Sequence, residues 1–230
     1  RGFIIVGKIK ASHQWDSDMF LLKTDSLGNT EWYKSIGNSK TIDSGASVIQ
    51  TPDSGYVISG SVWNASIAFS QDAYLIRTDK YGNVIWEKAL GGPYSDGPAH
   101  VDLAYDSNYI VAFSYAYEEN PPVQPRREIH VLKISPSKQI LWYKQFHIHR
   151  DQGIRCLREQ LDHKIVIIGN SYIIDTINLA DGDEAFIMKL TENGDSLWYR
   201  DIYYQSYLQY GEENSLHDFK PTSDGGFIAC

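Results

Sequence analysis

Apolar and polar residues alternate along this chain in short runs, and no stretch has the spacing of an amphipathic helix. Runs such as FLLKT (20–24) and YLIRT (74–78) are each followed by a polar turn and a second run that carries a tryptophan. Alternation with a period of two is typical of strands with one face against a core. The pattern therefore predicts an all-β protein made of short antiparallel strands.

The strand pattern repeats. Segments 18–32, 72–86, 128–142 and 184–198 align without a gap, and their tryptophans fall 54, 56 and 56 residues apart. The same spacing holds for these tryptophans and for one basic residue in each segment: Trp32, Trp86, Trp142 and Trp198, with Lys23, Arg77, Lys133 and Lys189. A fixed period of this length predicts one structural unit that is used several times.

Each aligned segment reads as a β-hairpin, since a glycine such as Gly82 supplies the positive φ of a tight turn. A second hairpin precedes it, most clearly at 47–62 with a turn at 52–55. Four short antiparallel strands in each repeat match the blade of a β-propeller. We predict a single propeller domain over 1–230, with repeats at approximately 1–46, 47–99, 100–154 and 155–213 and a partial repeat at 214–230.

Both ends of the chain fall in the second strand of a repeat, at GFIIVG (2–7) and GFIAC (226–230). Joining them would duplicate a strand instead of completing a blade. We therefore expect that sequence is missing and that the native ring has more blades. The repeated tryptophan is expected to fill the gap between neighbouring blades, because stacked repeats bury their faces on one another.

The order PDSGYVISG (52–60), DAYLIRTDKYGNVIWEKALGG (72–92) and YSDG (94–97) resembles the propeller repeats of secreted and surface proteins of Bacteroidota. The resemblance covers essentially the whole chain. It implies a secreted or cell-surface scaffold exported by the type IX route, and it implies no reaction. Repeat three departs from the pattern at 135–138 and carries an insertion at 120–128, so specialised loops are expected there.

A weaker similarity links the chain to quinoprotein-like propellers, through the spacing of Asp79, Gly82 and Trp86. No cofactor constellation accompanies it, and fold does not imply function. We therefore predict no cofactor and leave open a structural cation.

The charge of the chain limits its partners. A formal net charge of −8, with no basic run, argues against a nucleic acid or an anionic membrane as partner. No apolar run approaches the roughly 18 residues of a membrane-spanning helix, so no membrane insertion is expected. The oligomeric state is left open.

Catalytic motifs are missing from the sequence. The Asp-box spacing of sialidase-like propellers does not fit Asp25, Gly28 and Trp32, and no Gly-x-Ser-x-Gly, phosphate-binding glycine loop or His-Glu-x-x-His occurs. No catalytic residue is therefore assigned.

Acidic residues recur just before the first strand of each repeat. This strand normally lines the central channel, so the residues could form a carboxylate rim that attracts a cation or a basic ligand. The alternative, which we favour, is that each one accepts hydrogen bonds from backbone donors at a loop-to-strand junction. The four residues are Asp43, Asp96, Asp151 and Glu212.

Two further patterns could begin a metal site. His147 and His149 fall on one side of an extended segment, and acidic runs at 16–18 and 181–184 are partial versions of a calcium loop. Further ligands are not evident, so structural roles are the simpler interpretation and no metal is predicted.

The most variable segments connect the second strand to the third and the fourth to the next blade. Loops on a rigid ring are the usual place for binding, and aromatic rings with arginines suit a protein or a polysaccharide. The predicted binding residues are Trp15, Trp63, Tyr115, Tyr117, Arg126, Arg127, Tyr204 and Tyr207. We thus predict a noncatalytic binding scaffold; a propeller hydrolase or lyase with carboxylates or histidines at the channel mouth is the alternative, and a purely structural spacer is a third possibility.

Overall fold

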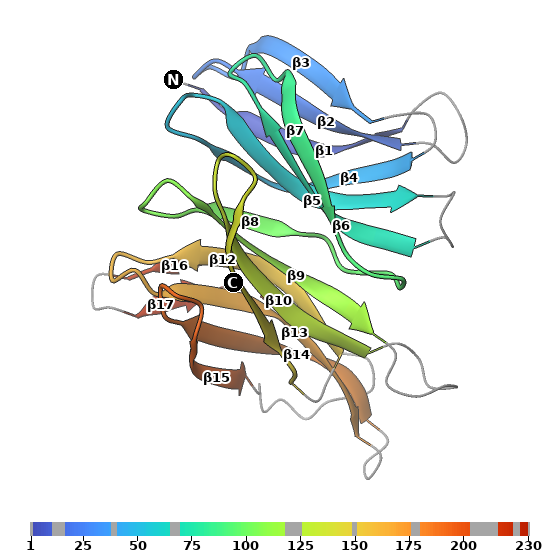
Figure 1. Cartoon of the computed structure of the whole chain (residues 1–230), viewed down its shortest axis with the longest axis vertical. Helices are drawn as coiled ribbons and strands as arrows, with labels where there is room; N and C mark the ends of the chain where they lie inside the picture. Colours follow the sequence, from blue (N-terminus) through green and yellow to red (C-terminus); the bar gives the residue numbers. More distant parts are fainter. Residues whose placement is uncertain are drawn as a thin grey trace.

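The computed structural model describes residues 2–10, 17–37, 41–64, 70–117, 126–148, 151–175, 180–202, 216–222 and 226–229. Every regular element in these ranges is a β-strand (Figure 1). From β1 to β15 the sheets follow one another in sequence order along the long axis of the molecule. Strand pairing is antiparallel except between β2 and β4, where Ser17 pairs with Ile42 in parallel and joins the first seven strands into one sheet. The all-β prediction, with four-stranded antiparallel blades in a propeller-like arrangement, is confirmed.

The strands of the described residues divide among five blades, with three strands in the first, four in each of the next three and two in the last. Blade 1 contains β1 (Ile4–Lys10), β2 (Ser17–Thr24) and β3 (Thr30–Ile36). Blade 2 contains β4 (Thr41–Gln50), β5 (Tyr56–Asn64), β6 (Ser70–Thr78) and β7 (Val84–Leu90). Blade 3 contains β8 (His100–Leu103), β9 (Tyr109–Tyr117), β10 (Arg126–Ile134) and β11 (Ile140–Phe146). Blade 4 contains β12 (Asp151–Glu159), β13 (Ile165–Asp175), β14 (Ala180–Leu190) and β15 (Ser196–Ile202), and blade 5 contains β16 (Phe219–Pro221) and β17 (Phe227–Ala229).

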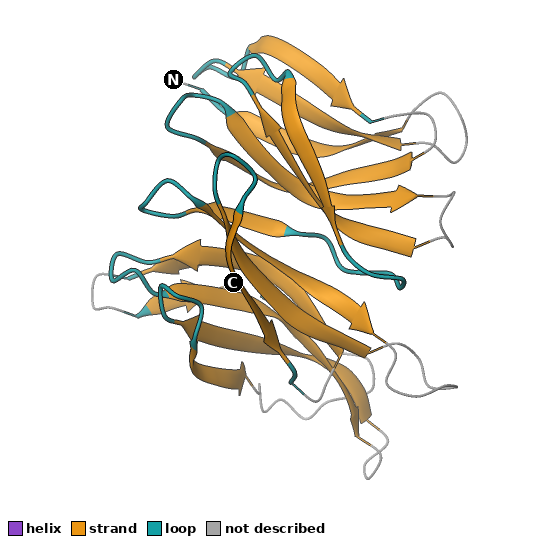
Figure 2. Cartoon of the chain, viewed as in Figure 1, coloured by secondary structure: helices purple, strands orange, loops and turns teal. Residues whose placement is uncertain are grey.

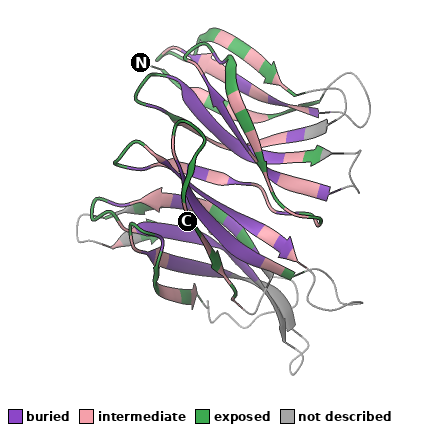
Figure 3. Ribbon diagram, viewed as in Figure 1, coloured by how far each residue is buried: buried purple, intermediate pink, exposed green. Residues whose placement is uncertain are grey.

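The core lies between the blades. Four clusters of buried side chains each combine residues of two neighbouring blades, as where Val57 and Leu75 of blade 2 meet Val111 and Leu132 of blade 3. The outer strands β3, β7 and β11 alternate exposed and half-buried residues, whereas the middle strands are buried (Figure 3). Each sheet is thus stabilised by its neighbours, as expected for stacked repeats.

The hairpin turns gather on one side of the molecule, which we call the turn end (Figure 2). In blade 2 the Oδ1 atom of Asp79 accepts hydrogen bonds from the backbone N–H groups of Tyr81 and Asn83 at 2.8 and 2.9 Å, and Gly82 has φ of 79°. Blade 3 builds the same turn from other residues, with Lys138 at φ 72° and the Ser135 hydroxyl accepting from the N–H of Gln139 at 3.1 Å. The departure in the third repeat therefore changes the residues but preserves the turn.

The repeated tryptophan packs against the turn of the next blade. A Cβ atom at Gly82 would lie 2.9 Å from the ring of Trp32, and one at Gly194 would lie 2.8 Å from Trp142. Trp86 instead donates from Nε1 to the carbonyl of Pro136 at 3.0 Å. The predicted role of this residue as an inter-blade filler is confirmed for these three blades.

Replacing Gly82 with alanine is expected to lower the free energy of unfolding by about 2 kcal/mol, because alanine is strained at positive φ and its methyl group would displace Trp32. Gly28 is the matched control, since it has φ of 87° and no atom within 4 Å of an added Cβ. Gly28→Ala should therefore show only the strain, about 1 kcal/mol. Urea unfolding would measure both, and equal losses would show that the tryptophan contact adds nothing.

The repeated basic residue also has a structural role. Lys133 and Lys189 form ion pairs with Asp106 and Asp162 at 2.7 and 3.3 Å, in the turns between the first and second strands. Arg77 pairs in the same way with Asp53 at 2.5 Å, and it is buried. Each of these blades thus ties its third strand to the turn that joins its first two strands.

Candidate binding site

The end of the blades opposite the turns, which we call the loop end, includes Asp43, Trp63, Tyr117 and Arg126 at the ends of their strands. Five of the eight predicted binding residues fall within the described residues: Trp63, Tyr115, Tyr117, Arg126 and Arg127. Trp15, Tyr204 and Tyr207 lie outside them. Trp63 and Arg126 are exposed, and the other three are half-buried.

Two exposed or half-exposed rings face the same gap between blades 2 and 3. Trp63 lies on the face of β5 that carries Val57, a member of the cluster between these blades. Tyr117 lies on the face of β9 that carries Phe113 and Tyr115, which belong to the same cluster from the other side. Strand alternation therefore directs both aromatic rings towards one inter-blade gap at the loop end.

A hydrogen-bonded layer of side chains underlies this aromatic pair. The ring of Tyr115 stacks on His130, with centroids 4.3 Å apart and planes 8° from parallel. His130 Nε2 lies 2.6 Å from Glu128 Oε1, and Nδ1 is hydrogen-bonded to the hydroxyl of Tyr143. Burial lowers the pKa of His130, so we assign the neutral tautomer in which Nε2–H donates to Glu128 and Nδ1 accepts from Tyr143.

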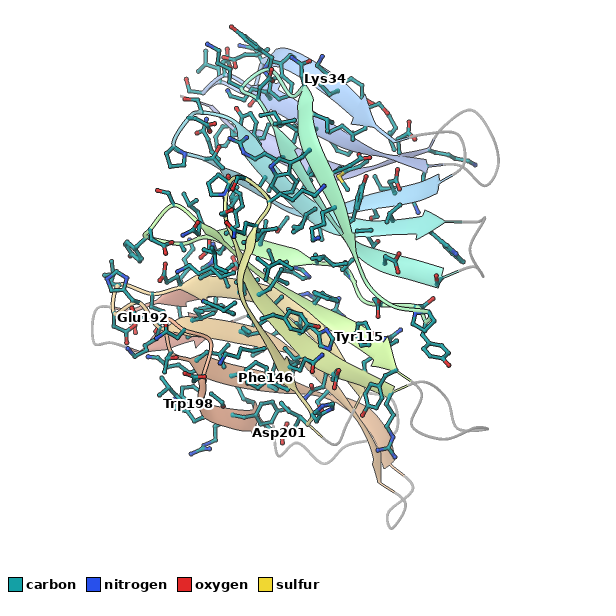
Figure 4. The ribbon with its side chains drawn as sticks, in the orientation of Figure 1. Lys34, Tyr115, Phe146, Glu192, Trp198 and Asp201 are labelled. Carbon is teal, nitrogen blue, oxygen red and sulfur yellow. The ribbon has the colours of Figure 1, made fainter. Side chains whose placement is uncertain are left out.

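His147 connects the buried layer to the surface. Its Nδ1 atom contacts the second oxygen of Glu128, and the ring of Tyr117 meets the imidazole edge-on at 6.0 Å. Figure 4 labels Tyr115 and Phe146 in this region of blade 3. Tyr117 thus packs against a side chain that itself contacts the buried layer.

Blades 1 and 4 show that the fold does not require a polar side chain at the position of His130. The positions equivalent to His130 are Phe20, Tyr74 and Phe186, at the repeat spacing of 54 and 56 residues. Phe186 stacks on Tyr199 at 5.5 Å, where blade 3 has the hydrogen bond between His130 and Tyr143. Buried polar groups are costly even when paired, so their presence in blade 3 indicates a role beyond folding.

The predicted carboxylate rim can be followed at two of its four positions. Asp43 and Asp96 are 3% and 2% exposed. The Oδ1 atom of Asp96 accepts from the N–H of Ala116 at 2.6 Å, and Oδ2 accepts from the N–H of Gly92 at 3.0 Å. Asp96 therefore links the connection after β7 to blade 3, which is the junction role that we favoured. The side chain of Asp151 and all of Glu212 lie outside the described residues.

Burial raises the pKa of Asp96 to about 6, although its two backbone hydrogen bonds act in the opposite direction. The nearby charge of Asp72 also raises it, and burial raises the pKa of Asp72 itself. A side chain at Gly91 would collide with both carboxylates, so they approach each other across that glycine. The sequence offered a signal for this pair, because every aligned segment begins with an acidic residue.

The same arrangement occurs one blade earlier and is modified one blade later. A side chain at Gly37 would collide with Asp18 and lie 2.9 Å from Asp43 Oδ2. In blade 3 the equivalent position is His147, whose imidazole contacts Glu128. Blades 1 and 2 thus share a pair of carboxylates next to a glycine, and blade 3 has a histidine in place of that glycine.

A groove of about 520 Å³ separates the outer strands of blades 1 and 2. The polar side chains in its lining include Lys34 and Ser35 of β3, Asp43 of β4, Tyr74 of β6 and Glu87 of β7. The hydroxyl of Tyr74 is hydrogen-bonded to Glu87, and burial together with the charges of Glu87 and Asp43 raises its pKa. Figure 4 labels Lys34 at this end of the molecule.

A second cavity, of about 390 Å³, lies at the turn end between blades 3 and 4. Its ionisable groups pair with one another, as Lys133 does with Asp106 at 2.7 Å and His163 with Glu159 at 3.7 Å. Glu192 also lines it (Figure 4). Because its central ion pair belongs to the repeated turn-end pattern, this cavity is explained by the blade architecture.

The described ranges contain no group of three or more His, Cys, Asp or Glu side chains that could hold a metal ion. His149, the partner proposed for His147, lies outside them. Cys156 is half-buried, and burial raises the pKa of its thiol to about 12, which disfavours the thiolate at neutral pH. None of the described residues forms a helix that could span a membrane.

Comparisons with known proteins add a likeness in fold. No family model matches the chain, and no curated protein matches its sequence. A crystal structure of a protein of unknown function from Bacteroides caccae aligns with 98% of this chain and 82% of its own, at 10% identity and a TM-score of 0.47. An endo-arabinase from Bacteroides thetaiotaomicron aligns with 92% of this chain and 80% of its own, at 11% identity and a TM-score of 0.52. At these identities the likeness concerns the fold alone.

Proposed function

We propose that this protein is a noncatalytic, secreted or cell-surface β-propeller that binds a polysaccharide through the loop end of blades 2 and 3. The observation that carries the proposal is the pair of rings, Trp63 and Tyr117, directed into one gap above the layer of Tyr115, His130 and Glu128. Aromatic rings with polar tips suit a ligand that has both apolar ring faces and hydroxyl groups.

A sugar polymer fits this surface better than a protein does. Among the described residues around the gap, the exposed imidazole of His147 and the guanidinium of Arg126 can form hydrogen bonds with sugar hydroxyls. A solved protein with a similar fold is an endo-arabinase, so this kind of fold is compatible with a glycan ligand.

The local geometry favours binding over hydrolysis. Glycoside hydrolysis uses two carboxylates that face each other across an open cleft. Asp96 has the raised pKa that a general acid needs, but it is 2% exposed and both of its oxygens accept backbone hydrogen bonds. Substrate could not reach this carboxylate without disrupting the junction that it holds.

Affinity gel electrophoresis on soluble arabinan, xylan, mannan and β-glucan would test the proposal. Wild-type protein should be retarded by at least one of them, and Trp63→Ala and Tyr117→Ala should each weaken retardation about tenfold, as loss of a stacking ring does. Tyr81→Ala is the matched control, because Tyr81 is exposed at the turn end. Unchanged retardation of both loop-end variants would overturn the proposal, and release of reducing sugar would favour the hydrolase alternative.

A further inference from the structure

The groove between blades 1 and 2 differs from the equivalent space between blades 2 and 3 at one decisive position. Val62 pairs with Asp72 on the neighbouring strand, as Tyr115 pairs with Glu128, so the two residues are equivalent in register. In blade 3 the ring of Tyr115 covers His130, and its hydroxyl reaches Gly92. In blade 2 the smaller Val62 leaves the space over Tyr74 open.

We propose that this groove is a second saccharide subsite, which takes one or two residues of a neutral sugar chain. Its volume of about 520 Å³ lies within the usual range of small-molecule pockets. The choice of ligand class rests on the proposed function, but the site is separate from the aromatic pair at Trp63 and Tyr117.

The charges in the groove select a neutral ligand. Glu87 and Asp43 would repel an anion, and Glu87 is already hydrogen-bonded to the hydroxyl of Tyr74, so it needs no cation as a partner. Sugar hydroxyls can donate to Glu87 and accept from a neighbouring donor at the same time. A neutral, hydroxyl-rich ligand is therefore the class that these walls accommodate without a buried unpaired charge.

Two residues of the lining, Glu87 and Tyr74, are expected to make the specific contacts with the sugar, and Lys34 is not. Lys34 donates to Asn83 Oδ1 at 3.1 Å, just as Lys144 of blade 3 pairs with Asp195 of blade 4 at 2.7 Å, so this lysine belongs to the scaffold. Glu87 and Tyr74 replace the stacked aromatic pairs of blades 1 and 4 and are not needed by the fold. Glu87 is exposed, so its carboxylate is accessible to a ligand.

Saturation-transfer NMR with cellobiose, xylobiose, mannobiose and arabinobiose tests the subsite. We expect at least one probe to bind the wild-type protein, and Val62→Tyr, which copies Tyr115, to weaken that binding by about tenfold or more by filling the groove. Glu87→Gln keeps the shape but removes the charge-assisted hydrogen bond, and about a tenfold loss is expected. Ile85→Tyr is the control, because Ile85 is 58% exposed on the same strand and does not line the groove.

The outcomes separate this subsite from the proposed function. Wild-type binding of a disaccharide that survives both Val62→Tyr and Glu87→Gln, in variants with unchanged thermal unfolding, overturns the subsite. The subsite is also overturned if the protein binds no disaccharide but still shows Trp63-dependent retardation by a polysaccharide. In both cases the proposed function stands. Failure of every disaccharide and every polysaccharide overturns both proposals.

Discussion

Replacing Arg77 with methionine is expected to lower the free energy of unfolding by about 3 kcal/mol. The guanidinium group is buried and donates from Nη2 to both carboxylate oxygens of Asp53, at 2.6 and 2.5 Å. Its Nε donates to the hydroxyl of Tyr109 at 3.2 Å, and its Nη1 donates to the backbone carbonyls of Tyr56 and Thr78. Methionine would fill the space but leave the buried Tyr109 hydroxyl without this donor.

Most of the expected loss arises at Tyr109 rather than at Asp53. Asp53 is largely exposed, so water can solvate its carboxylate once the arginine is gone. Tyr109 is 1% exposed, and a buried hydroxyl that loses its partner costs about 1–3 kcal/mol. The double variant Arg77→Met/Tyr109→Phe should therefore be more stable than the sum of the two single changes predicts.

Urea unfolding of the four proteins in this cycle measures the coupling directly. Arg77→Lys is the matched control, because Lys133 and Lys189 make the equivalent ion pair in blades 3 and 4. It should lose about 1 kcal/mol, since lysine keeps the ion pair but cannot make every bond of the guanidinium fork. A methionine variant as stable as the wild type would show that the buried arginine contributes no net stability.

The fold could be predicted because its signals are local and repeated. The positive φ of the turn glycines, the tryptophan that packs on Gly82 or Gly194, and the basic residue at position 77 or 133 all recur at one spacing. Each signal reports a contact inside one blade or with the adjacent blade. Such contacts between neighbouring blades, repeated along the sequence, determine the architecture.

The candidate site was only partly predictable for a related reason. Trp63, Tyr115 and Tyr117 were identified because loop-end aromatics are conspicuous, and strand alternation could have directed them to one gap. His130 and Tyr143 are diagonal neighbours on the paired strands β10 and β11, so their contact depends on the register of the two strands. That register shifts after Lys133. A single sequence does not specify such a contact.

The repeats themselves provide the missing signal. Positions that carry Phe20 and Phe186 in two blades carry Tyr74 and His130 in the other two, and all four lie in the same place in their blades. A repeat protein contains its own comparison set, because each blade shows what the fold tolerates at a position. Departures from the common residue towards a buried, ionisable one therefore identify functional candidates without any alignment of homologues.

Asp96 gives the prediction with the clearest dependence on pH. Burial is the largest cause that raises its pKa from 3.8 to about 6 in the folded protein. A carboxyl group with a raised folded-state pKa binds more protons folded than unfolded between these values. Its contribution to stability is therefore greatest below about pH 4 and is lost as pH rises through 6, by about 3 kcal/mol in total.

Asp96→Asn removes this titration but retains the shape. The amide can accept from only one of the two N–H groups, Ala116 or Gly92, and it turns an N–H towards the other. At pH 4 the variant should therefore be about 2 kcal/mol less stable than the wild type. As pH rises to 8 this difference in stability should vanish or reverse, because only the wild type is destabilised by a buried charge.

The difference between the two proteins isolates Asp96 from other groups that titrate in the same range. His100, for example, has a pKa lowered to about 4 by burial, so its contribution is lost as pH falls, in the opposite direction. It affects both proteins equally and cancels. Urea unfolding at half-unit steps from pH 4 to pH 8 gives the difference in the free energy of unfolding between the two proteins. In an Asp72→Asn background, the midpoint of this pH dependence should move to lower pH, because the charge of Asp72 helps to raise the pKa of Asp96. A difference that does not change with pH would show that Asp96 is ionised throughout and that its two backbone hydrogen bonds outweigh its burial.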